Sequence, residues 1–339
     1  MRKYDLAVVG ATGAVGQELL QVLAERGFPY DPESLKLLAS ERSAGKKINY
    51  QGREYTVEAT VPDSFTGVDI VLFAGGAASK LFAREAVARG AVVIDNSSTF
   101  RYDDNVPLVV PEINPKDAAW HQGIIANPNC STIQMVMALK PIYDAVGLKR
   151  VVVSTYQAVS GAGVEAIEEL RRQSALVSQG REIQPKVFPH QIAFNLIPQI
   201  DVFLENGYTK EEMKMVWETR KILGAPELAI CATAVRAPVY RSHSESVNIE
   251  TIKPLSAKEA KELLAAAPGV EVLDDPEQKL YPMPYQASHS DSVYVGRIRE
   301  DISCQNGLAF WVVSDQLRKG AATNAVQIAE LLYKEGGKS

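Results

Sequence analysis

The sequence predicts an α/β protein with an N-terminal doubly wound domain and a second, α+β domain whose sheet is largely antiparallel. The chain has 339 residues, about the length of two domains. Over the first 130 residues, short apolar runs alternate with helical patterns, as in a parallel sheet covered on both faces. Later strand-like segments follow one another with helices grouped between them, which is typical of an α+β unit. We therefore expect a first domain over residues 1–129, completed by a C-terminal helix over 320–339, and a second domain over 130–319.

The first domain is predicted to begin with a strand, a turn and a helix. Residues Val15, Leu19, Val22 and Leu23 recur at the spacing of one helix face, and Arg26-Gly27 ends that helix. The apolar runs interpreted as strands are Leu6–Val9, Leu35–Ala39, Val68–Ala74, Ala91–Ile94 and Leu108–Val110.

The second domain is predicted to begin with a buried helix over Ile133–Leu139. The segments interpreted as its strands, many of them β-branched, are Val151–Tyr156, Ala229–Val239, Val247–Ile252, Val293–Ile298 and Leu308–Val313. The final stretch, Gly320 to Glu335, is helical again, with an apolar stripe through Ala325, Ile328, Leu331 and Leu332.

Composition and charge exclude several classes of protein. Apolar residues make up 46% and charged residues 23%, the balance of an ordinary globular chain. A net charge of −5 without a basic block argues against nucleic acid or an anionic membrane as partner. No apolar run approaches the roughly 18 residues of a spanning helix, and the N-terminal run is too short for a signal peptide.

The cysteines and histidines predict neither disulfides nor a metal site. Cys130, Cys231 and Cys304 are widely separated and form no CxxC pair, which suits a reducing cytoplasm. The histidines and cysteines also lack the spacing of metal ligands. Cys231 and Cys304 fit inert core positions beside or within strands.

The loop Gly10-Ala11-Thr12-Gly13-Ala14-Val15-Gly16 joins the first strand to the first helix. Glycines at such a turn let the backbone approach a pyrophosphate, whose charge lies against the free N–H groups of the helix N-terminus. Because strand, loop and helix occur in the right order, we interpret this segment as a dinucleotide site of the Rossmann type. A plain strand-to-helix turn is the alternative.

The second predicted strand ends in Ser40-Glu41-Arg42-Ser43. An acid at this place usually binds the ribose hydroxyls of NAD, whereas an arginine accommodates the 2′-phosphate of NADP. Both residue types are present, but Lys46 and Lys47 make the local charge positive, which favours NADP if Glu41 points away. A solvated charged turn would have the same composition.

Cys130 lies where a turn meets a helix. Asn127-Pro128-Asn129 favours a turn, and Ser131 and Thr132 can satisfy the free N–H groups of the helix that follows. A thiol at the positive end of a helix has a lowered pKa, so the thiolate is favoured. Since the dinucleotide-binding half ends here, we expect Cys130 to lie near the nicotinamide and to act as a nucleophile.

His243 lies in a different sequence context from the other three histidines. Of the four histidines, it alone lies among crowded polar residues, in Arg236-Ala237-Pro238-Val239-Tyr240-Arg241-Ser242-His243-Ser244-Glu245, where Pro238 interrupts a strand. His121, His190 and His289 fit structural roles.

Several motifs together resemble the aspartate-β-semialdehyde dehydrogenase family over nearly the full chain. They are GATGAVG, NPNC, STYQAVSGAG, RAPVYRSHSESV and RKGAATNAVQIAELL. The resemblance implies reversible, NADP-dependent reductive dephosphorylation of L-4-aspartyl phosphate to L-aspartate 4-semialdehyde and phosphate, at the branch leading to lysine, diaminopimelate, threonine and methionine. It also implies a homodimer, or a tetramer of two such dimers, with contact through the sheet of the second domain.

A cysteine suits this reaction. Thiolate addition to an aldehyde gives a tetrahedral adduct that releases hydride to the nicotinamide, and phosphate can displace the resulting thioester. In the biosynthetic direction Cys130 attacks aspartyl phosphate first. By the same resemblance, His243 is the general acid/base and Gln157 orients the thioester.

The resemblance also assigns residues to the substrate. Arg236 binds the carboxylate, Glu211 the ammonium group, and Lys214 and Arg101 the phosphate, while Asn129 contributes to the oxyanion site or the substrate pocket. From spacing alone, Glu211, Glu212 and Lys214 would be an ordinary solvated helix face. Ser242 is a departure, because many relatives carry glycine before the histidine.

The implied cofactor contacts are Gly10, Thr12, Gly13, Ala14, Val15, Ser40, Arg42, Ser43, Gly75, Ser160, Gly161 and Asn324, the last at the nicotinamide amide. Two alternatives remain. An N-acetyl-glutamyl-phosphate reductase would not need Glu211, because an acetylated amine carries no charge. A non-catalytic NADP-binding redox sensor would keep the glycine loop but would not need Cys130, His243, Arg236 and Lys214 together.

Overall fold

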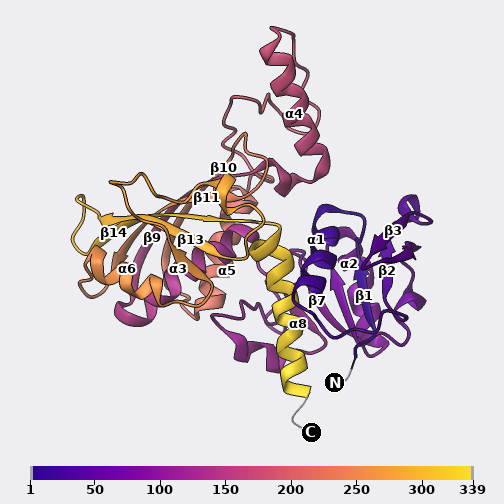
Figure 1. Cartoon of the computed structure of the whole chain (residues 1–339). Coiled ribbons are helices and arrows are strands. Elements are labelled where there is room, and N and C mark those ends of the chain that lie inside the picture. The colour runs from indigo at the N-terminus through magenta and orange to yellow at the C-terminus, as the bar shows by residue number, and fades with distance from the viewer. Residues whose placement is uncertain (1–2, 337–339) are drawn as a thin grey trace. The chain divides into compact units, whose positions relative to one another are not determined.

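The computed structural model describes residues 3–336, which divide into two compact units (Figure 1). The first unit comprises Met1–Asn129 and Ala321–Ser339, and the second comprises Cys130–Gly320. Residues 337–339, the end of the predicted C-terminal helix, lie outside the described part.

The first unit is built on a parallel sheet with the strand order β5-β2-β1-β6-β7-β8. The strands are β1 (Leu6–Val9), β2 (Lys36–Ala39), β5 (Glu58–Ala59), β6 (Ile70–Phe73), β7 (Val92–Asp95) and β8 (Ile124–Ala126). A hairpin of β3 (Lys47–Tyr50) and β4 (Arg53–Thr56) is inserted after β2. The strand order reverses between β1 and β6, and ligands of such sheets bind beyond the carboxyl ends of the strands at that point. The predicted doubly wound fold is confirmed.

Three helices cover this sheet: α1 (Ala14–Glu25), α2 (Gly76–Ala88) and α8 (Thr323–Gly336), counted over the described residues of the unit. Leu19 and Leu23 of α1 share one buried cluster with Leu6 and Leu37 of the sheet. Ile328 of α8 belongs to the same cluster, so this helix contributes to the core of the unit. Short 3₁₀ turns occur at Glu41–Ser43, Pro62–Phe65 and Pro115–Trp120.

The first four predicted strands are confirmed, but the fifth, Leu108–Val110, is wrong. This segment is buried, yet only Leu108 forms a bridge, to Ala126 of β8. The side chain of Asn114 accepts a hydrogen bond from the Val110 backbone (2.9 Å) and donates one to the Leu108 carbonyl (2.9 Å). The chain therefore turns where the apolar run predicted a strand, and Ile124–Ala126 takes the edge of the sheet.

The second unit is built on a mixed sheet with the order β10-β9-β11-β14-β13-β12. The strands are β9 (Leu148–Gln157), β10 (Ala229–Arg236), β11 (His243–Thr251), β12 (Val270–Val272), β13 (Val293–Glu300) and β14 (Gly307–Ser314). The inner neighbours β9, β11, β14 and β13 pair antiparallel, whereas β10 and β12 add to the two edges in parallel. The prediction of a largely antiparallel sheet is therefore confirmed, with parallel edges that it did not include.

Helices of the second unit lie mainly on one face of this sheet, where α3, α5 and α6 pack. Its helices are α3 (Cys130–Val146), α4 (Val164–Ser178), α5 (Lys210–Leu223), α6 (Ala257–Ala265) and α7 (Pro284–Ala287), with a 3₁₀ turn at Val159–Ala162 and a π-helical turn at Arg318–Ala322. Along β9, Val151 and Val153 are buried under the helices, whereas Val152 and Tyr156 on the other face are only half-buried. The second face of the sheet is thus open within this chain.

Helix α4 and the segment after it form an arm with a small core of its own (Figure 1). Leu170 of α4 packs with Ile192, Ala193 and Ile197 in a cluster separate from the rest of the unit. The arm extends away from the sheet of its own unit and returns to it before α5.

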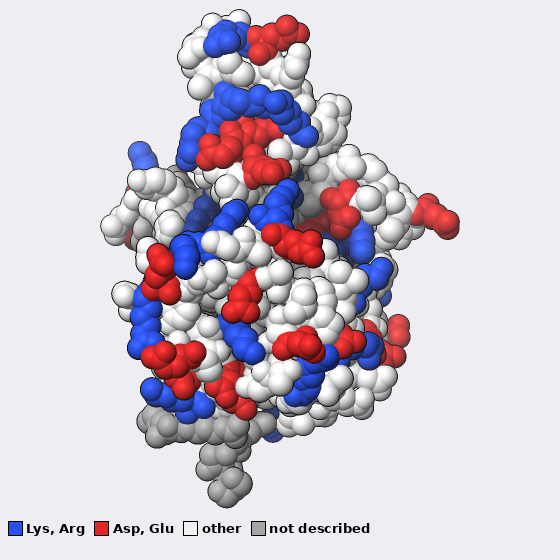
Figure 2. All heavy atoms as spheres, turned by 90° about the vertical axis from the view of Figure 1, so that its right-hand side faces the viewer, with Lys and Arg blue, Asp and Glu red and all other residues white. Residues whose placement is uncertain are grey.

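Charged side chains of both signs are intermixed on the face in Figure 2, and no large area of one sign covers the described residues there. No helix in the described range is both long enough and apolar enough to cross a membrane. Cys304 is exposed in the turn between β13 and β14, so its predicted core position is wrong, while Cys231 is half-buried in β10.

Candidate active site

Cys130 and His243 meet in the second unit. Cys130 is the first residue of α3 and His243 the first of β11, and the Sγ–Nε2 distance is 3.4 Å. Space beside Cys130 is limited at position 320, which is a glycine: a Cβ on Gly320 would lie 3.0 Å from the Cβ of Cys130. The helix was predicted to begin at Ile133, but it begins three residues earlier, at Cys130. The thiol therefore lies in the N-terminal turn of α3.

The surroundings of His243 determine which ring nitrogen carries a proton. The backbone N–H of Ala158 donates to Nδ1 at 3.0 Å, so the neutral ring holds its proton on Nε2, the atom that faces the thiol. Burial lowers the pKa of His243 to about 3, with a further lowering by the Arg236 charge. The fold thus presents a neutral imidazole whose Nε2–H points to the sulfur of Cys130.

Ser242, the residue before this histidine, has an unusual backbone conformation. Its φ of 73° lies in the left-handed region, which glycine adopts without strain. Here the Ser242 N–H donates to Oε1 of Gln316 (2.7 Å), and its hydroxyl is 3.0 Å from that of Ser288. Gln316, which sequence reasoning missed, also donates to the hydroxyl of Ser160 and so joins the two loops around His243.

Arg236 ends β10 in a nearly dry environment. Its Nη1 donates to the carbonyl of Ala158 (2.7 Å), and burial lowers its pKa even though Glu211 and Cys130 oppose the shift. Gly161 lies close beside it, because a Cβ there would lie 3.2 Å from Nη1 of Arg236 and 3.4 Å from Cε1 of His243. Of the predicted cofactor contacts, Ser160 and Gly161 therefore lie beside His243 and Arg236.

Gln157, Glu211 and Lys214 form a continuous polar chain. Nε2 of Gln157 donates to Glu211 (3.1 Å), and Lys214 donates to Glu211 and to Asp201 (2.9 Å each). Burial lowers the pKa of Lys214, but the two carboxylates outweigh this and the net shift is upward. Gln157 is fixed from its other side by the hydroxyl of Thr155, at 3.0 Å.

The residues of α5 are not the solvated face that spacing alone predicted. Glu211 and Glu212 are both buried. Glu212 completes a capping box with Thr209 and accepts the backbone N–H of Ala234 (2.9 Å), which attaches α5 to β10. Asp201, the second partner of Lys214, carried no sequence signal because it lies in an irregular loop.

The first unit contains the glycine loop. Gly10 has a φ of +85°, and a Cβ on Gly16 would lie 2.2 Å from the carbonyl oxygen of Gly10, so only glycine allows α1 to approach β1 this closely. Gly13 occupies the N-cap position of α1 without a side-chain cap, and the first turn of the helix carries no acid. Thr12, Ala14 and Val15 are partly exposed there.

Two further predicted cofactor segments follow β6 and β2, the strands on either side of β1. Gly75 is the N-cap of α2, and a Cβ on Gly10 would lie 3.8 Å from its backbone nitrogen. Ser40 is the N-cap of the 3₁₀ turn that contains Arg42 and Ser43. Ser40 and Arg42 are exposed and Ser43 is buried. Loops after β1, β2 and β6 thus meet at one edge of the sheet, as a dinucleotide site requires.

The remaining predicted residues, Arg101, Asn129 and Asn324, are buried in the first unit. Arg101 donates through Nε to the Asn127 carbonyl (2.9 Å) and through Nη2 to the Asn96 carbonyl (2.7 Å). Nδ2 of Asn324 donates to the Val109 carbonyl (2.9 Å) and to Oδ1 of Asn127 (2.6 Å). These four hydrogen bonds go to three backbone carbonyls and one side-chain amide oxygen.

The structure thus brings the predicted site residues together in two groups. The second unit gathers Cys130, Gln157, Ser160, Gly161, Glu211, Lys214, Arg236 and His243. The first unit holds the loop residues and Arg101, Asn129 and Asn324. Among the residues with described positions, no group of three or more His, Cys, Asp or Glu side chains is placed to hold a metal ion.

The chain is similar to known proteins over nearly its whole length. Residues 5–121 match the family model "Semialdehyde dehydrogenase, NAD binding domain", and residues 139–319 match "Semialdehyde dehydrogenase, dimerisation domain". The chain is 59% identical to an aspartate-semialdehyde dehydrogenase of Aquifex aeolicus, over 98% of this chain and 99% of that protein. It is 56% identical to the Bacillus subtilis protein of the same name, over 98% of each.

Solved structures are similar over the same extent. Aspartate semialdehyde dehydrogenase II from Vibrio cholerae superposes with a TM-score of 0.95 at 51% identity, covering 98% of this chain and 99% of that one. The enzyme from Candida albicans, solved with NADP, has a TM-score of 0.74 at 26% identity, covering 98% and 99%. The chain therefore belongs to the aspartate-semialdehyde dehydrogenase family.

Proposed function

We propose that this chain reduces L-4-aspartyl phosphate to L-aspartate 4-semialdehyde and phosphate, reversibly and with NADPH, using Cys130 as nucleophile and His243 as acid/base. The observation that carries the proposal is the Sγ–Nε2 distance of 3.4 Å between a helix-start cysteine and a buried neutral histidine. The helix N-terminus and the Nε2–H donor both stabilise negative charge on that sulfur.

In the biosynthetic direction, the Cys130 sulfur attacks the acyl carbon of aspartyl phosphate. The C–S bond forms, the C–O bond to phosphate breaks, and phosphate leaves with the bonding electrons. His243 gives its Nε2 proton to the substrate oxygen as that oxygen gains negative charge, and it takes the same proton back when the carbonyl re-forms. After reduction, the C–S bond breaks and Cys130 is released as thiolate with the aldehyde.

The residues of the first unit fit a bound NADP. Gly10 and Gly16 clear the backbone path, and the uncapped N-terminus of α1 leaves its N–H groups available to a pyrophosphate. Gly13 and Gly75 open two helices at this edge, and exposed Arg42 is the group suited to a 2′-phosphate. When bound, NADPH supplies the hydride that reduces the Cys130 thioester.

Thr12, Ala14, Val15, Ser40 and Ser43 complete the assigned phosphate and ribose contacts. Ser160, Gly161 and Asn324 are assigned to the nicotinamide end. Glycine at position 161 leaves room in this crowded place, since a Cβ there would lie 3.2 Å from Nη1 of Arg236.

The charged groups of the substrate are bound by side chains of opposite charge. Arg236 offers a planar guanidinium for the carboxylate, and Glu211 offers a buried carboxylate for the ammonium group. Gln157, fixed between Thr155 and Glu211, orients the thioester. Lys214 and Arg101 are assigned to phosphate, and Asn129 to the oxyanion or the substrate pocket.

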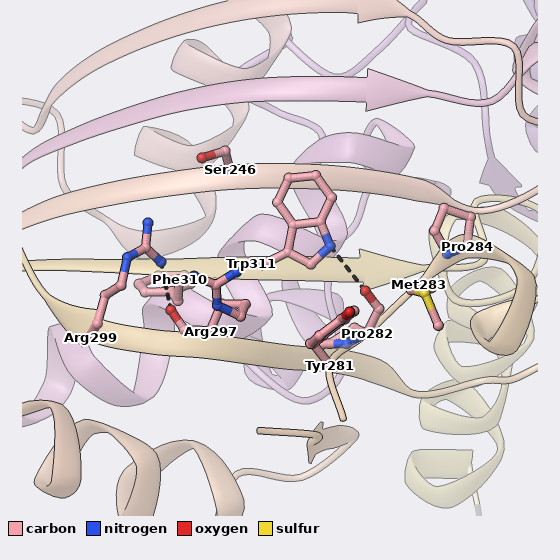
Figure 3. A pocket seen from close by; sticks show the side chains of 9 residues that line it. All are labelled: Ser246, Tyr281, Pro282, Met283, Pro284, Arg297, Arg299, Phe310 and Trp311. Atoms are coloured by element: carbon pink, nitrogen blue, oxygen red, sulfur yellow. Dashed lines mark hydrogen bonds between the residues drawn. The ribbon is translucent and has the colours of Figure 1, made fainter. Parts of the chain in front are cut away.

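We further propose that the enzyme is a homodimer whose contact is the open face of the mixed sheet. On that face the rings of Tyr156 and Trp311 lie 5.5 Å apart, between centroids. Trp311, Arg297 and Arg299 line a pocket of about 290 Å³, and Figure 3 shows their side chains. A family match over 139–319 to a dimerisation domain supports this, and the free cysteines support a reducing, cytoplasmic setting.

The decisive assay is phosphate-dependent reduction of NADP with L-aspartate 4-semialdehyde, repeated with NAD and with the N-acetyl-glutamyl analogue. We expect turnover to require phosphate and to prefer NADP. A rate independent of phosphate would indicate a hydrolytic aldehyde dehydrogenase, and preference for the acetylated substrate would indicate the reductase of N-acetyl-glutamyl phosphate. Glu211 favours the first result, because an acetylated amine has no charge to pair with it.

A further inference from the structure

Within the described residues, the guanidinium of Arg236 makes hydrogen bonds on one side and not on the other. Nη1 donates to the Ala158 carbonyl at 2.7 Å, and burial disfavours the charge on this group. The charge of Glu211 favours the cation, but a carboxylate hydrogen-bonded to the guanidinium would compete with the substrate carboxylate for the same N–H donors. A group that stabilises the cation without taking its donors would avoid that competition.

Phe188 is such a group. The Cζ atom of Arg236 lies 5.8 Å from the centroid of the Phe188 ring, within the range of a cation–π contact. The face of an aromatic ring attracts a cation but accepts no strong hydrogen bond, so it leaves the N–H groups of the guanidinium to a ligand. Phe188 is half-buried and comes from the irregular segment that follows α4.

That segment is fixed by a buried carboxylate. Glu169 of α4 accepts the backbone N–H groups of Lys186 (3.0 Å), Val187 (2.7 Å) and Phe188 (3.5 Å). Only 3% of Glu169 is exposed, and besides these donors it accepts the amide of Gln173 at 3.0 Å and lies 4.0 Å from the Arg172 guanidinium. The position of the Phe188 ring therefore depends on Glu169, a residue of α4 that is not one of the catalytic residues.

We propose that Phe188, fixed by Glu169, is a positioning residue that holds the Arg236 guanidinium ready for the carboxylate of the substrate. The inference rests on the proposed role of Arg236 and goes beyond it by giving the α4 arm a part in substrate selection. It predicts that the arm affects binding of substrates with a free α-carboxylate, and that it does not affect the chemistry at Cys130.

Phe188→Leu tests this directly, because it keeps an apolar side chain and removes the π face. We expect the KM for L-aspartate 4-semialdehyde to rise roughly three- to tenfold, with kcat and the KM values for NADP and phosphate within twofold of wild type. Phe188→Tyr keeps the ring and should restore the wild-type KM. Phe194→Leu is the matched control, since Phe194 lies in the same segment with 72% of its surface exposed.

A second substrate separates this effect from a general loosening of the fold. With the α-carboxamide of aspartate semialdehyde, wild type and Phe188→Leu should have the same KM, because no carboxylate reaches Arg236. An equal rise for both substrates, or a KM for the carboxylate substrate within twofold of wild type, would overturn the proposal. If wild type itself did not distinguish carboxylate from carboxamide, the assigned role of Arg236 would fail instead.

Glu169→Gln tests the link from α4. An amide at this place directs an N–H₂ group toward backbone N–H donors, so the segment should loosen and the KM for the carboxylate substrate should rise in the same direction. An unchanged KM would contradict the claim that Glu169 fixes Phe188. Thermal unfolding of each variant, compared with Phe194→Leu, verifies that the chain remains folded.

Discussion

At the scale of single residues, the proton positions around His243 follow from one backbone contact. Because the Ala158 N–H occupies Nδ1, only Nε2 can exchange a proton with a group at Cys130. An imidazolium would place two donors against each other at Nδ1, in a site where burial already disfavours the charge. The histidine is therefore suited to hold one proton at one atom.

His243→Gln should lower kcat by roughly a hundred- to ten-thousandfold, because an amide can donate a hydrogen bond but cannot exchange the proton. Since burial lowers the pKa of His243 to about 3, the wild-type rate should show no loss near pH 6.5 caused by this residue. Steady-state rates between pH 5 and 8 test both points. If the wild-type rate changed with an apparent pKa near 6.5 and this change were absent in the variant, the described environment of His243 would be contradicted.

Glu245 is a second buried titratable residue on β11, and it predicts a pH-dependent stability. Burial raises its pKa well above 4.5, and the amide of Gln134 only partly opposes this. The folded chain therefore keeps the proton while the unfolded chain loses it, so stability falls as pH rises above about 4.5. The expected slope is about 1.4 kcal/mol per pH unit, until the folded-state pKa is reached.

Glu245→Gln removes that dependence. Its thermal midpoint, compared with that of wild type, should be similar near pH 4.5 and increasingly higher from pH 5 to pH 8. A difference between the two proteins that does not change with pH would show that Glu245 is ionised in the folded state.

At the scale of elements, the close approach of α1 to β1 depends on Gly16. Gly16→Ala would place a Cβ 2.2 Å from the Gly10 carbonyl, so the helix must move away from the strand. We expect a loss of about 1–3 kcal/mol in stability together with weaker NADP binding. Gly76→Ala is the control, since its Cβ would lie 3.5 Å from the nearest atom, Cβ of Ser97. Equal stability and NADP affinity for both variants would contradict the packing described.

The strand and helix pattern was predictable where burial and periodicity agree. Leu6–Val9 and the helix after it were found because apolar residues recur at regular spacing and glycines mark the turn. Leu108–Val110 was wrongly predicted as a strand, because a buried loop has the same apolar composition. The backbone of this loop is hydrogen-bonded by Asn114. The short edge strands β5 and β12 have too few residues to produce a period.

The candidate site was predictable where residue type and local turn chemistry coincide, as at Cys130 and His243. Their proximity was not, because 113 residues separate them along the chain. Gln316 and Asp201 act through long-range hydrogen bonds, and a single sequence carries no mark of such partners. The assignments of Arg236, Glu211 and Lys214 came from family resemblance, and burial now distinguishes Glu211 and Lys214 from a solvated helix face.

At the scale of the whole molecule, the open face of the mixed sheet predicts the assembly. Ser246 is half-buried on that face, opposite Trp311 in the register of β11 and β14. Ser246→Arg should place an unpaired charge in the proposed interface and shift the dimer toward the 37.0 kDa chain. Light scattering after size exclusion measures this, with Thr66→Arg on an exposed loop of the first unit as control. A dimer that persists unchanged in Ser246→Arg would place the interface elsewhere.

The central claim is that Cys130 carries the acyl group, and a trapping experiment tests it most directly. The enzyme is mixed with L-aspartate 4-semialdehyde and NADP in the absence of phosphate, quenched with acid, and examined by intact mass and peptide mapping. We expect an aspartyl thioester on Cys130, its loss on addition of phosphate, and no adduct in Cys130→Ala, whose turnover should fall by at least about a thousandfold. An active enzyme that shows no adduct at Cys130, or carries it on another residue, would contradict the mechanism.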